Sequence, residues 1–262
     1  MNLYRAGLLL LYGSLVVAVT GCMSGSPIVQ MGQSNSFNLA PGNWQVTASS
    51  AVTNNSTTLM GGYLNQSGNN IAGAFHVFDL QCFDPTTDVV LNGSVAGEKA
   101  TIVSSAAGGQ TISFTVSAAS PSALTGSYAI TGGCAAGQKG SLTAVLVPSI
   151  SGSWKGTLAS TSGAAVRVSA VLTQTAADAH GLFHVSGNLT FTGSPCFTSA
   201  SIDSGFLAGE VAGISATADD GSTLNFTANL GDPSSANSFA GQYTIAGGSC
   251  AGDHGSGSLV KQ

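Results

Sequence analysis

In Thr223-Leu224-Asn225-Phe226-Thr227-Ala228-Asn229-Leu230, polar and apolar side chains alternate without a break. The stretch Thr111-Ile112-Ser113-Phe114-Thr115-Val116 has the same pattern in the first half of the chain. A period of two places successive side chains on opposite faces of a β-strand, so that one face is buried and the other is hydrated. Such strands favour antiparallel sheets. We therefore predict an all-β protein.

The chain contains the same unit twice. Gly42-Asn43-Trp44 matches Gly152-Ser153-Trp154, and a cysteine followed by phenylalanine recurs at Cys82 and Cys196. Because further matches keep the same order, we interpret the chain as a tandem duplication. These matches are Leu64-Asn65-Gln66 with Leu172-Thr173-Gln174, Phe75-His76-Val77 with Phe183-His184-Val185, Leu91–Gly97 with Leu207–Gly213, and Gly126-Ser127-Tyr128-Ala129-Ile130 with Gly241-Gln242-Tyr243-Thr244-Ile245.

Each unit is predicted to hold about eight short strands joined by tight turns, as in a meander barrel. In the second unit they are expected near 152–159, 165–174, 181–190, 198–206, 208–218, 222–230, 239–246 and 256–261. Asp220-Gly221 is typical of a hairpin, because glycine adopts positive φ readily. We expect a small antiparallel meander that closes into a barrel and leaves no exposed edge. A two-sheet β-sandwich is the alternative.

The Gly-x-Trp that opens each unit and the later Gly-x-Tyr-x-Ile strand resemble those of avidin-type and lipocalin-type barrels. The resemblance covers one tryptophan and a few glycines per unit. Avidins line their pocket with several tryptophans, so the resemblance implies a barrel but no biotin site.

The first residues have the pattern of an export signal. Arg5 is followed by a mainly apolar run to Val19, and Thr20-Gly21 precede Cys22. The run is shorter than the roughly 20 residues of a membrane-spanning helix. The pattern resembles the lipobox of bacterial lipoproteins, whereas an ordinary secretory signal with a nearby cysteine is the alternative.

The lipobox resemblance implies that residues 1–21 are a signal peptide and that Cys22 carries acyl chains that anchor the protein to a lipid bilayer. Met23 stands where an aspartate would favour the inner membrane, so the outer membrane is expected. Residues 22–41 are expected to form a flexible tether, followed by β-domain repeats at 42–148 and 149–262.

Four further cysteines are expected to form disulfides, because exported proteins meet oxidising conditions. Each unit has two of them, so the simplest pairing is Cys82 with Cys134 and Cys196 with Cys250. The C-x-x-C pairs typical of zinc sites are absent.

Composition excludes several function classes. The net charge is −5, and only 6% of the residues are charged, against about 25% in an ordinary soluble domain. The few lysines and arginines are scattered, which argues against nucleic acid as a partner. A strand surface with so few charges is expected to favour weak homo-oligomers or contact with surface polymers.

No residue cluster indicates catalysis, a metal site or a cofactor. His76 and His184 are expected at equivalent strand positions, facing solvent, and His180 with His184 lacks a third ligand. The carboxylates of Asp84-Pro85-Thr86-Thr87-Asp88 could hold calcium and Asp219-Asp220 could be an acid–base pair, but both stretches are interpreted as turns. Glu98 and Glu210 are not expected at equivalent positions. The nucleophile elbow and the H-E-x-x-H motif are absent.

Three functions remain open at this point. We expect a non-enzymatic envelope lipoprotein that binds a partner or serves a structural role. The alternative is a carrier of a small apolar ligand inside a barrel, which requires a cavity of several hundred Å³. An enzyme is the third hypothesis, and it requires a cleft that joins His76 or His184 with a carboxylate.

Overall fold

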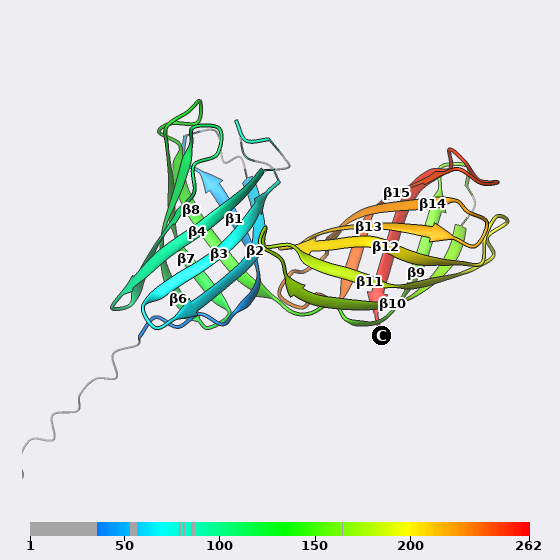
Figure 1. Ribbon diagram of the computed structural model, residues 1–262, viewed down its shortest axis with the longest axis horizontal. Helices are drawn as coiled ribbons and strands as arrows, with labels where there is room; N and C mark the ends of the chain where they lie inside the picture. The colour runs from blue at the N-terminus through cyan, green and yellow to red at the C-terminus, as the bar shows by residue number, and fades with distance from the viewer. Residues whose placement is uncertain (1–35, 53–56, 79, 81, 85–86, 164) are drawn as a thin grey trace, which may run out of the picture. The chain divides into compact units, whose positions relative to one another are not determined.

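The computed structural model describes residues 36–52, 57–78, 80, 82–84, 87–163 and 165–262. Over these residues the chain forms strands and turns and no helix. Sixteen strands make two closed antiparallel barrels of eight strands each (Figure 1). The predicted fold class is therefore confirmed. Cys22, the signal peptide and most of the expected tether lie outside the described residues.

The first barrel is built from the first eight strands in chain order. They are β1 (Gly42–Ser50), β2 (Thr57–Ser67), β3 (Asn70–Val77), β4 (Thr87–Ala96), β5 (Lys99–Ser104), β6 (Thr111–Ser120), β7 (Ala123–Thr131) and β8 (Lys139–Val147).

The second barrel follows after a short connection. Its strands are β9 (Gly152–Ser160), β10 (Ala165–Ala177), β11 (Phe183–Thr192), β12 (Ser199–Ala208), β13 (Val211–Ala218), β14 (Thr223–Leu230), β15 (Ser238–Ala246) and β16 (His254–Lys261). All eight strands expected in this unit are present, with bounds that differ by a few residues.

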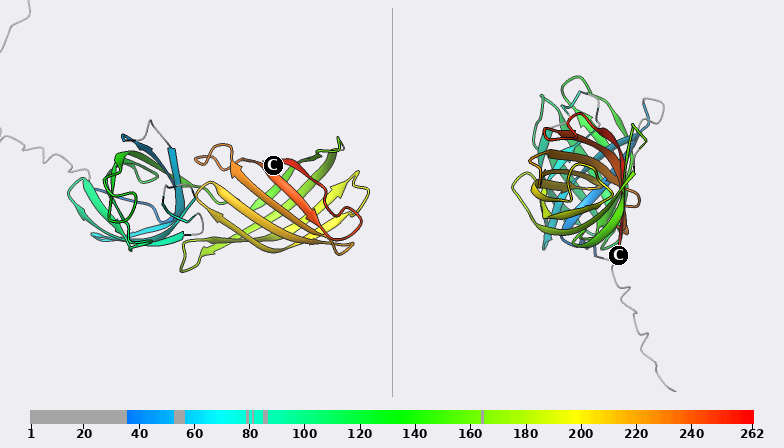
Figure 2. Two further views of the ribbon diagram at one scale, coloured as in Figure 1. Left: turned by 90° about the horizontal axis from the view of Figure 1, so that it is seen from above. Right: turned by 90° about the vertical axis from the view of Figure 1, so that its right-hand side faces the viewer.

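Each barrel is an up-and-down meander (Figure 2). Every strand pairs with the next one along the chain, and closure comes from β1 with β8 and from β9 with β16. Closure removes the free edges that a sandwich would keep, so the sandwich alternative is wrong. Gly221 has a φ of +83° in the turn between β13 and β14, which explains the glycine there.

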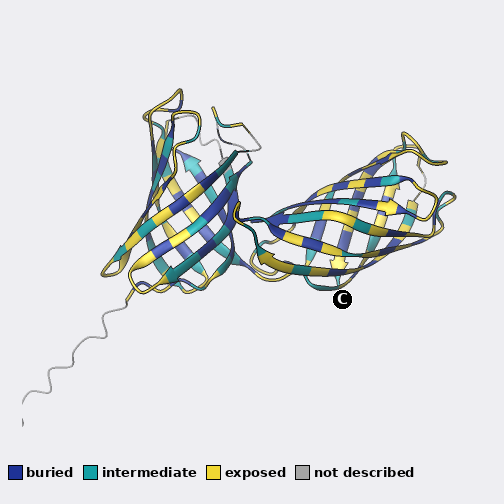
Figure 3. Ribbon diagram, in the orientation of Figure 1, coloured by how far each residue is buried: buried dark blue, intermediate teal, exposed yellow. Residues whose placement is uncertain are grey.

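The strands carry the predicted alternation into the fold. Along β14, buried and exposed side chains alternate from Leu224 onward, and bands of both kinds cross the barrel walls in Figure 3. Each barrel encloses its own cluster of buried apolar side chains, and Trp44 and Trp154 are fully buried. Each repeat therefore has its own hydrophobic core.

One end of each barrel is closed around its tryptophan. The indole N–H of Trp44 donates to the Ala40 carbonyl at 3.1 Å, and that of Trp154 donates to the Ile150 carbonyl at 2.9 Å. Just before β1, Phe37 and Leu39 are buried in the first core. The expected tether therefore ends before Phe37, because burying these two side chains is more favourable than exposing them to water.

The strand registers correct the match between the repeats. Leu64 pairs with Gly73, whereas Leu172 pairs with Gly187, so Gly187 is the counterpart of Gly73. His184 is then not equivalent to His76. The reason is a difference in strand length. A tight turn joins β2 to β3, whereas β10 and β11 are longer strands, so the residues near their shared turn have no counterpart in the first repeat.

The strand registers also show that Glu98 and Glu210 are equivalent positions of the two repeats. Ala96 pairs with Lys99 across one turn, and Ala208 pairs with Val211 across the other. Glu98 and Glu210 therefore occupy equivalent turns, contrary to the sequence-based expectation. Glu98 is exposed and Glu210 is partly buried.

Candidate functional site

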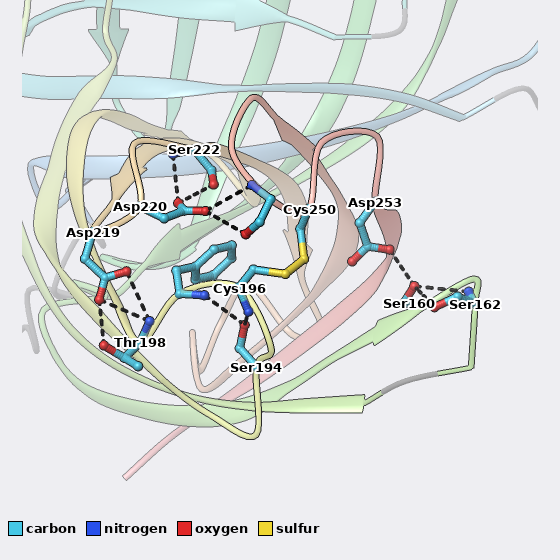
Figure 4. The surroundings of a disulfide bond; sticks show 12 residues. Ser160, Ser162, Ser194, Cys196, Thr198, Asp219, Asp220, Ser222, Cys250 and Asp253 are labelled. Carbon is cyan, nitrogen blue, oxygen red and sulfur yellow. Dashed lines mark hydrogen bonds between the residues drawn. A yellow bond between two sulfur atoms is a disulfide. The ribbon is translucent and has the colours of Figure 1, made fainter.

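Each barrel has a disulfide at the end opposite its tryptophan. Cys82 is bonded to Cys134, and Cys196 is bonded to Cys250, which confirms one disulfide per repeat and none between repeats. In the second barrel, Figure 4 shows the Cys196–Cys250 bond among the serine and aspartate side chains of this end. The bond joins the loop before β12 to the turn between β15 and β16.

A cavity of about 260 Å³ lies beside this disulfide. Its apolar wall includes side chains from β9, β10, β11 and β15. The rings of Phe191 and Phe197 pack edge to face, with their centroids 4.8 Å apart. The lining residues used below are Leu158, Val166, Phe191, Phe197 and Ile245 on the apolar side, and Ser160, Ser162, Tyr243 and Asp253 on the polar side.

The polar side of the cavity is organised around Asp253. The Tyr243 hydroxyl donates to Asp253 Oδ2 at 3.0 Å. The Ser160 hydroxyl donates to Oδ1, and Figure 4 shows this bond between Ser160 and Asp253. Burial, the hydrogen bond to Asp253 and its charge raise the pKa of Tyr243, in that order of effect. The phenol therefore remains a protonated donor at neutral pH.

Two other carboxylates at this end are engaged within the protein. Asp219 Oδ2 accepts from the Thr198 hydroxyl at 2.6 Å, and this bond lowers the pKa of Asp219. Asp220 accepts from Ser222 and Ser249, and the bond from the Ser222 hydroxyl is the largest cause of its lowered pKa. Asp219-Asp220 is thus a turn, as the sequence indicates.

The interior of the second barrel is filled. The apolar space at its centre, between side chains such as Leu172, Leu224 and Phe226, measures about 20 Å³. Phe183 and Tyr243 both belong to the core cluster, and Tyr243 also lines the cavity at the disulfide end. A carrier with its ligand in the barrel interior is therefore not what this geometry supports.

The first barrel has a buried amide at the corresponding end. Gln110 is buried, its Nε2 donates to the Cys82 carbonyl at 2.7 Å, and its Oε1 accepts from the Ala135 N–H at 2.9 Å. Gln110 directly precedes β6 as Ser222 directly precedes β14. The longer side chain joins both sides of the disulfide loop in the first barrel.

The histidines do not lie as the sequence indicated. His76 is only 15% exposed, and its Nδ1 lies 2.7 Å from Asp88 Oδ1. The other carboxylate oxygen of Asp88 lies 3.0 Å from Nδ1 of His180. His184 is 63% exposed, as expected, and its Nε2 lies 3.6 Å from Asp178. The expectation of solvent exposure was wrong for His76, because its ring lies against Asp88 on the adjacent strand and against the ring of Phe78.

These groups do not form a metal site. No set of three or more histidine, cysteine, aspartate or glutamate side chains in the described ranges is placed to hold a metal ion. A search of the same ranges also finds no helix with the length and hydropathy to cross a membrane.

Residues from both repeats form a buried polar contact within the compact unit Asn35–Gln262. Asn43 and Gln45 are 2% and 1% exposed, although they alternate with the inward-facing Trp44. Gln45 Oε1 accepts from the Glu210 N–H at 2.7 Å. Burial raises the pKa of Glu210.

Sequence reasoning missed Asp253 and the Asn43–Gln45 pair. Asp253 could have been found in the sequence because the equivalent position of the first repeat is the uncharged Gln138. Recognising this difference requires the correct alignment of the last turn of the two repeats. Asn43 and Gln45 have the alternation of an exposed face, so their burial has no sequence signature. His76 and Asp88 belong to the first repeat and His180 belongs to the second, and only the fold brings them together.

No protein-family model matches this chain, and no curated protein matches it. A crystal structure of kievitone hydratase from Nectria haematococca is similar over 90% of this chain and 94% of its own, at 11% identity and a TM-score of 0.24.

Proposed function

We propose that this chain is an exported, non-enzymatic binding protein, anchored to the bacterial envelope through Cys22, whose second barrel binds a small and mainly apolar molecule. The observation that carries the proposal is the cavity of about 260 Å³ beside the Cys196–Cys250 disulfide. Its size is just below the range of about 300–1,000 Å³ that is typical of ligand pockets. It combines an apolar wall with a few convergent polar groups, as such pockets do.

The disulfide supports this proposal through the rigidity of the cavity wall. Cys250 itself lines the cavity and is tied to the loop that presents Phe197. A wall that is ordered before binding spares a ligand the entropic cost of ordering it. Because the centre of the barrel is filled, the space for a ligand is at the disulfide end.

Binding is tested with Ser162→Trp, because Ser162 is an exposed turn residue that lines the cavity. The indole is expected to obstruct the cavity and leave the core intact. Val52→Trp is the matched control: Val52 is exposed, and its N–H bonds to Ser50 as that of Ser162 bonds to Ser160.

The measurement is native mass spectrometry of protein extracted from the membrane of its own host. A small molecule retained by wild type and Val52→Trp and lost from Ser162→Trp would support the proposal. No retained molecule in any of the three, with no binding of small apolar compounds by calorimetry, would exclude it.

The anchor is tested separately. Cys22→Ser should release the protein from the membrane fraction, and the intact mass should lack the acyl chains that wild type carries. A wild-type protein without fatty acid would contradict the anchor and leave the cavity proposal untouched.

An acid–base enzyme is the second candidate, favoured by one observation. A carboxylate at Nδ1 of His76 is the arrangement that orients a catalytic imidazole. We propose a structural role instead, because both oxygens of Asp88 are engaged, one by His76 and one by His180. The cluster then links residues of the two repeats.

A further inference from the structure

We propose that the molecule bound beside the Cys196–Cys250 disulfide is an apolar amine, with its ammonium group on Asp253 and its apolar body between Phe191 and Ile245. This inference rests on the proposed function and adds the chemical class of the ligand. It is carried by a difference between the two repeats at one equivalent position.

The backbone establishes that Asp253 and Gln138 are equivalent. The N–H of Ile245 donates to the Asp253 carbonyl at 2.8 Å, and the N–H of Ile130 donates to the Gln138 carbonyl, also at 2.8 Å. Tyr243 in β15 and Tyr128 in β7 both pair with a glycine of the following strand. The second barrel therefore has a carboxylate where the first has a neutral amide.

The carboxylate is held in position by neutral groups. Its two described side-chain partners are the hydroxyls of Ser160 and Tyr243, and each donates to a different oxygen. Within the described ranges, no lysine or arginine forms an ion pair with Asp253. Each carboxylate oxygen can accept a further hydrogen bond, because a carboxylate has about four acceptor sites.

The surroundings favour a cationic head group over other polar groups. A carboxylate at the edge of an apolar wall attracts a cation more strongly than a carboxylate in open water, because less solvent screens the pair. An anionic head group would be repelled by the charge of Asp253, which lines the cavity. A neutral hydroxyl would donate a hydrogen bond without the charge, which is the weaker contact.

The apolar wall determines the remainder of the ligand. Leu158, Val166, Phe191, Phe197 and Ile245 offer aliphatic and aromatic contacts and no further charge. The edge-to-face rings of Phe191 and Phe197 suit a flat ring or a short aliphatic chain. A small amine with one apolar group satisfies both sides of the cavity.

Three water-soluble probes that share a phenyl ring and differ in the polar group test this inference. Benzylamine, benzyl alcohol and benzoate are titrated by calorimetry at pH 7 into the full-length mature protein in detergent, with empty micelles as the blank. Benzylamine is expected to bind at least about tenfold more tightly than benzyl alcohol, since a charge-assisted bond is roughly twice as strong as a neutral one. Benzoate is expected to bind most weakly.

Asp253→Asn should remove the preference for the amine and retain binding of the alcohol. Asp220→Asn is the matched control, because Asp220 is a carboxylate of the same end that does not line the cavity. If Asp253→Asn does not fold, the order of the three probes on the wild-type protein still decides the question.

The possible failures are distinguishable. If benzyl alcohol or benzoate binds as tightly as benzylamine and Ser162→Trp abolishes binding of all three, the cavity is a binding site but the amine class is wrong. If none of the probes binds and no retained molecule is found, the proposed function fails and the inference fails with it.

Discussion

Asn43 and Gly209 exchange two hydrogen bonds although 166 residues separate them. Asn43 Nδ2 donates to the Gly209 carbonyl at 2.9 Å, and the Gly209 N–H donates to Asn43 Oδ1 at 2.7 Å. An added Cβ on Gly61 would lie 2.4 Å from the Gly209 backbone, so the approach requires glycine at both positions. A buried amide thus joins β1 to the turn between β12 and β13.

Asn43→Ala should lower the free energy of unfolding by about 2–4 kcal/mol, because it leaves two buried backbone groups of Gly209 without partners. Urea unfolding followed by tryptophan fluorescence measures the change. Asn92→Ala is the control, since Asn92 is an exposed asparagine on β4 and should change stability by about 0.5 kcal/mol or less. Equal effects of the two variants would contradict the assigned role of Asn43.

Glu210→Gln should stabilise the protein at neutral pH. Burial raises the folded-state pKa of Glu210 above its ordinary value of 4.5, so the ionised side chain costs stability once the pH exceeds that folded-state pKa. The contribution of the protonated form is fully present below 4.5 and is lost as the pH rises through the folded-state pKa.

The measurement for Glu210 is the difference in unfolding free energy between wild type and Glu210→Gln across this pH window. The difference should favour the variant at pH 7 and shrink as the pH falls toward 4. Other titrating groups, such as Asp219 and Asp220, contribute equally to both proteins and cancel. A difference that does not change with pH would rule out burial of this carboxylate.

Replacing Cys196 and Cys250 together with serine should lower the free energy of unfolding by about 4 kcal/mol, because a crosslink of this span restricts the unfolded chain. The loop between them spans 54 residues, and the bond in the first barrel spans 52. Loss of the bond should also abolish ligand retention, since Cys250 lines the cavity. The Cys82→Ser, Cys134→Ser double variant should lose similar stability but keep the ligand.

Asp88→Asn separates the structural role from the catalytic one. An amide retains part of the hydrogen bonding to His76 and His180, so the expected loss is about 1 kcal/mol of stability. Thermal unfolding measures it, and His184→Gln, at an exposed histidine outside this pair, should have a smaller effect. A chemical turnover that wild type performs and Asp88→Asn loses, without loss of stability, would instead support the enzyme hypothesis.

Alternation and repetition predicted most of the fold. The alternating stretch around Phe226 became β14, and the tandem units became two barrels because a strand with one apolar face must bury it. The match of Phe75-His76-Val77 to Phe183-His184-Val185 failed for a physical reason. A period of two makes short strand segments resemble one another, and only the pairing of Leu172 with Gly187 determines the true register.

The candidate site was largely beyond reach of the sequence. Asp253 follows Cys250 in a turn, where an aspartate is ordinarily a turn former. Its role depends on Tyr243 and Ser160, which come from two other strands. The cavity also depends on the side chains around it, which fill the barrel interior but not its disulfide end.

Residue order alone was sufficient for the strands, the duplication and the cysteine pairing, because period-two burial and the spacing of cysteines within each repeat are local properties. The register that separates His184 from His76, the meeting of Asp88 with His180 and the contact of Asn43 with Gly209 arise only when distant strands meet. These features depend on which surfaces come together, and a buried outer face has the same pattern of side chains as a hydrated one.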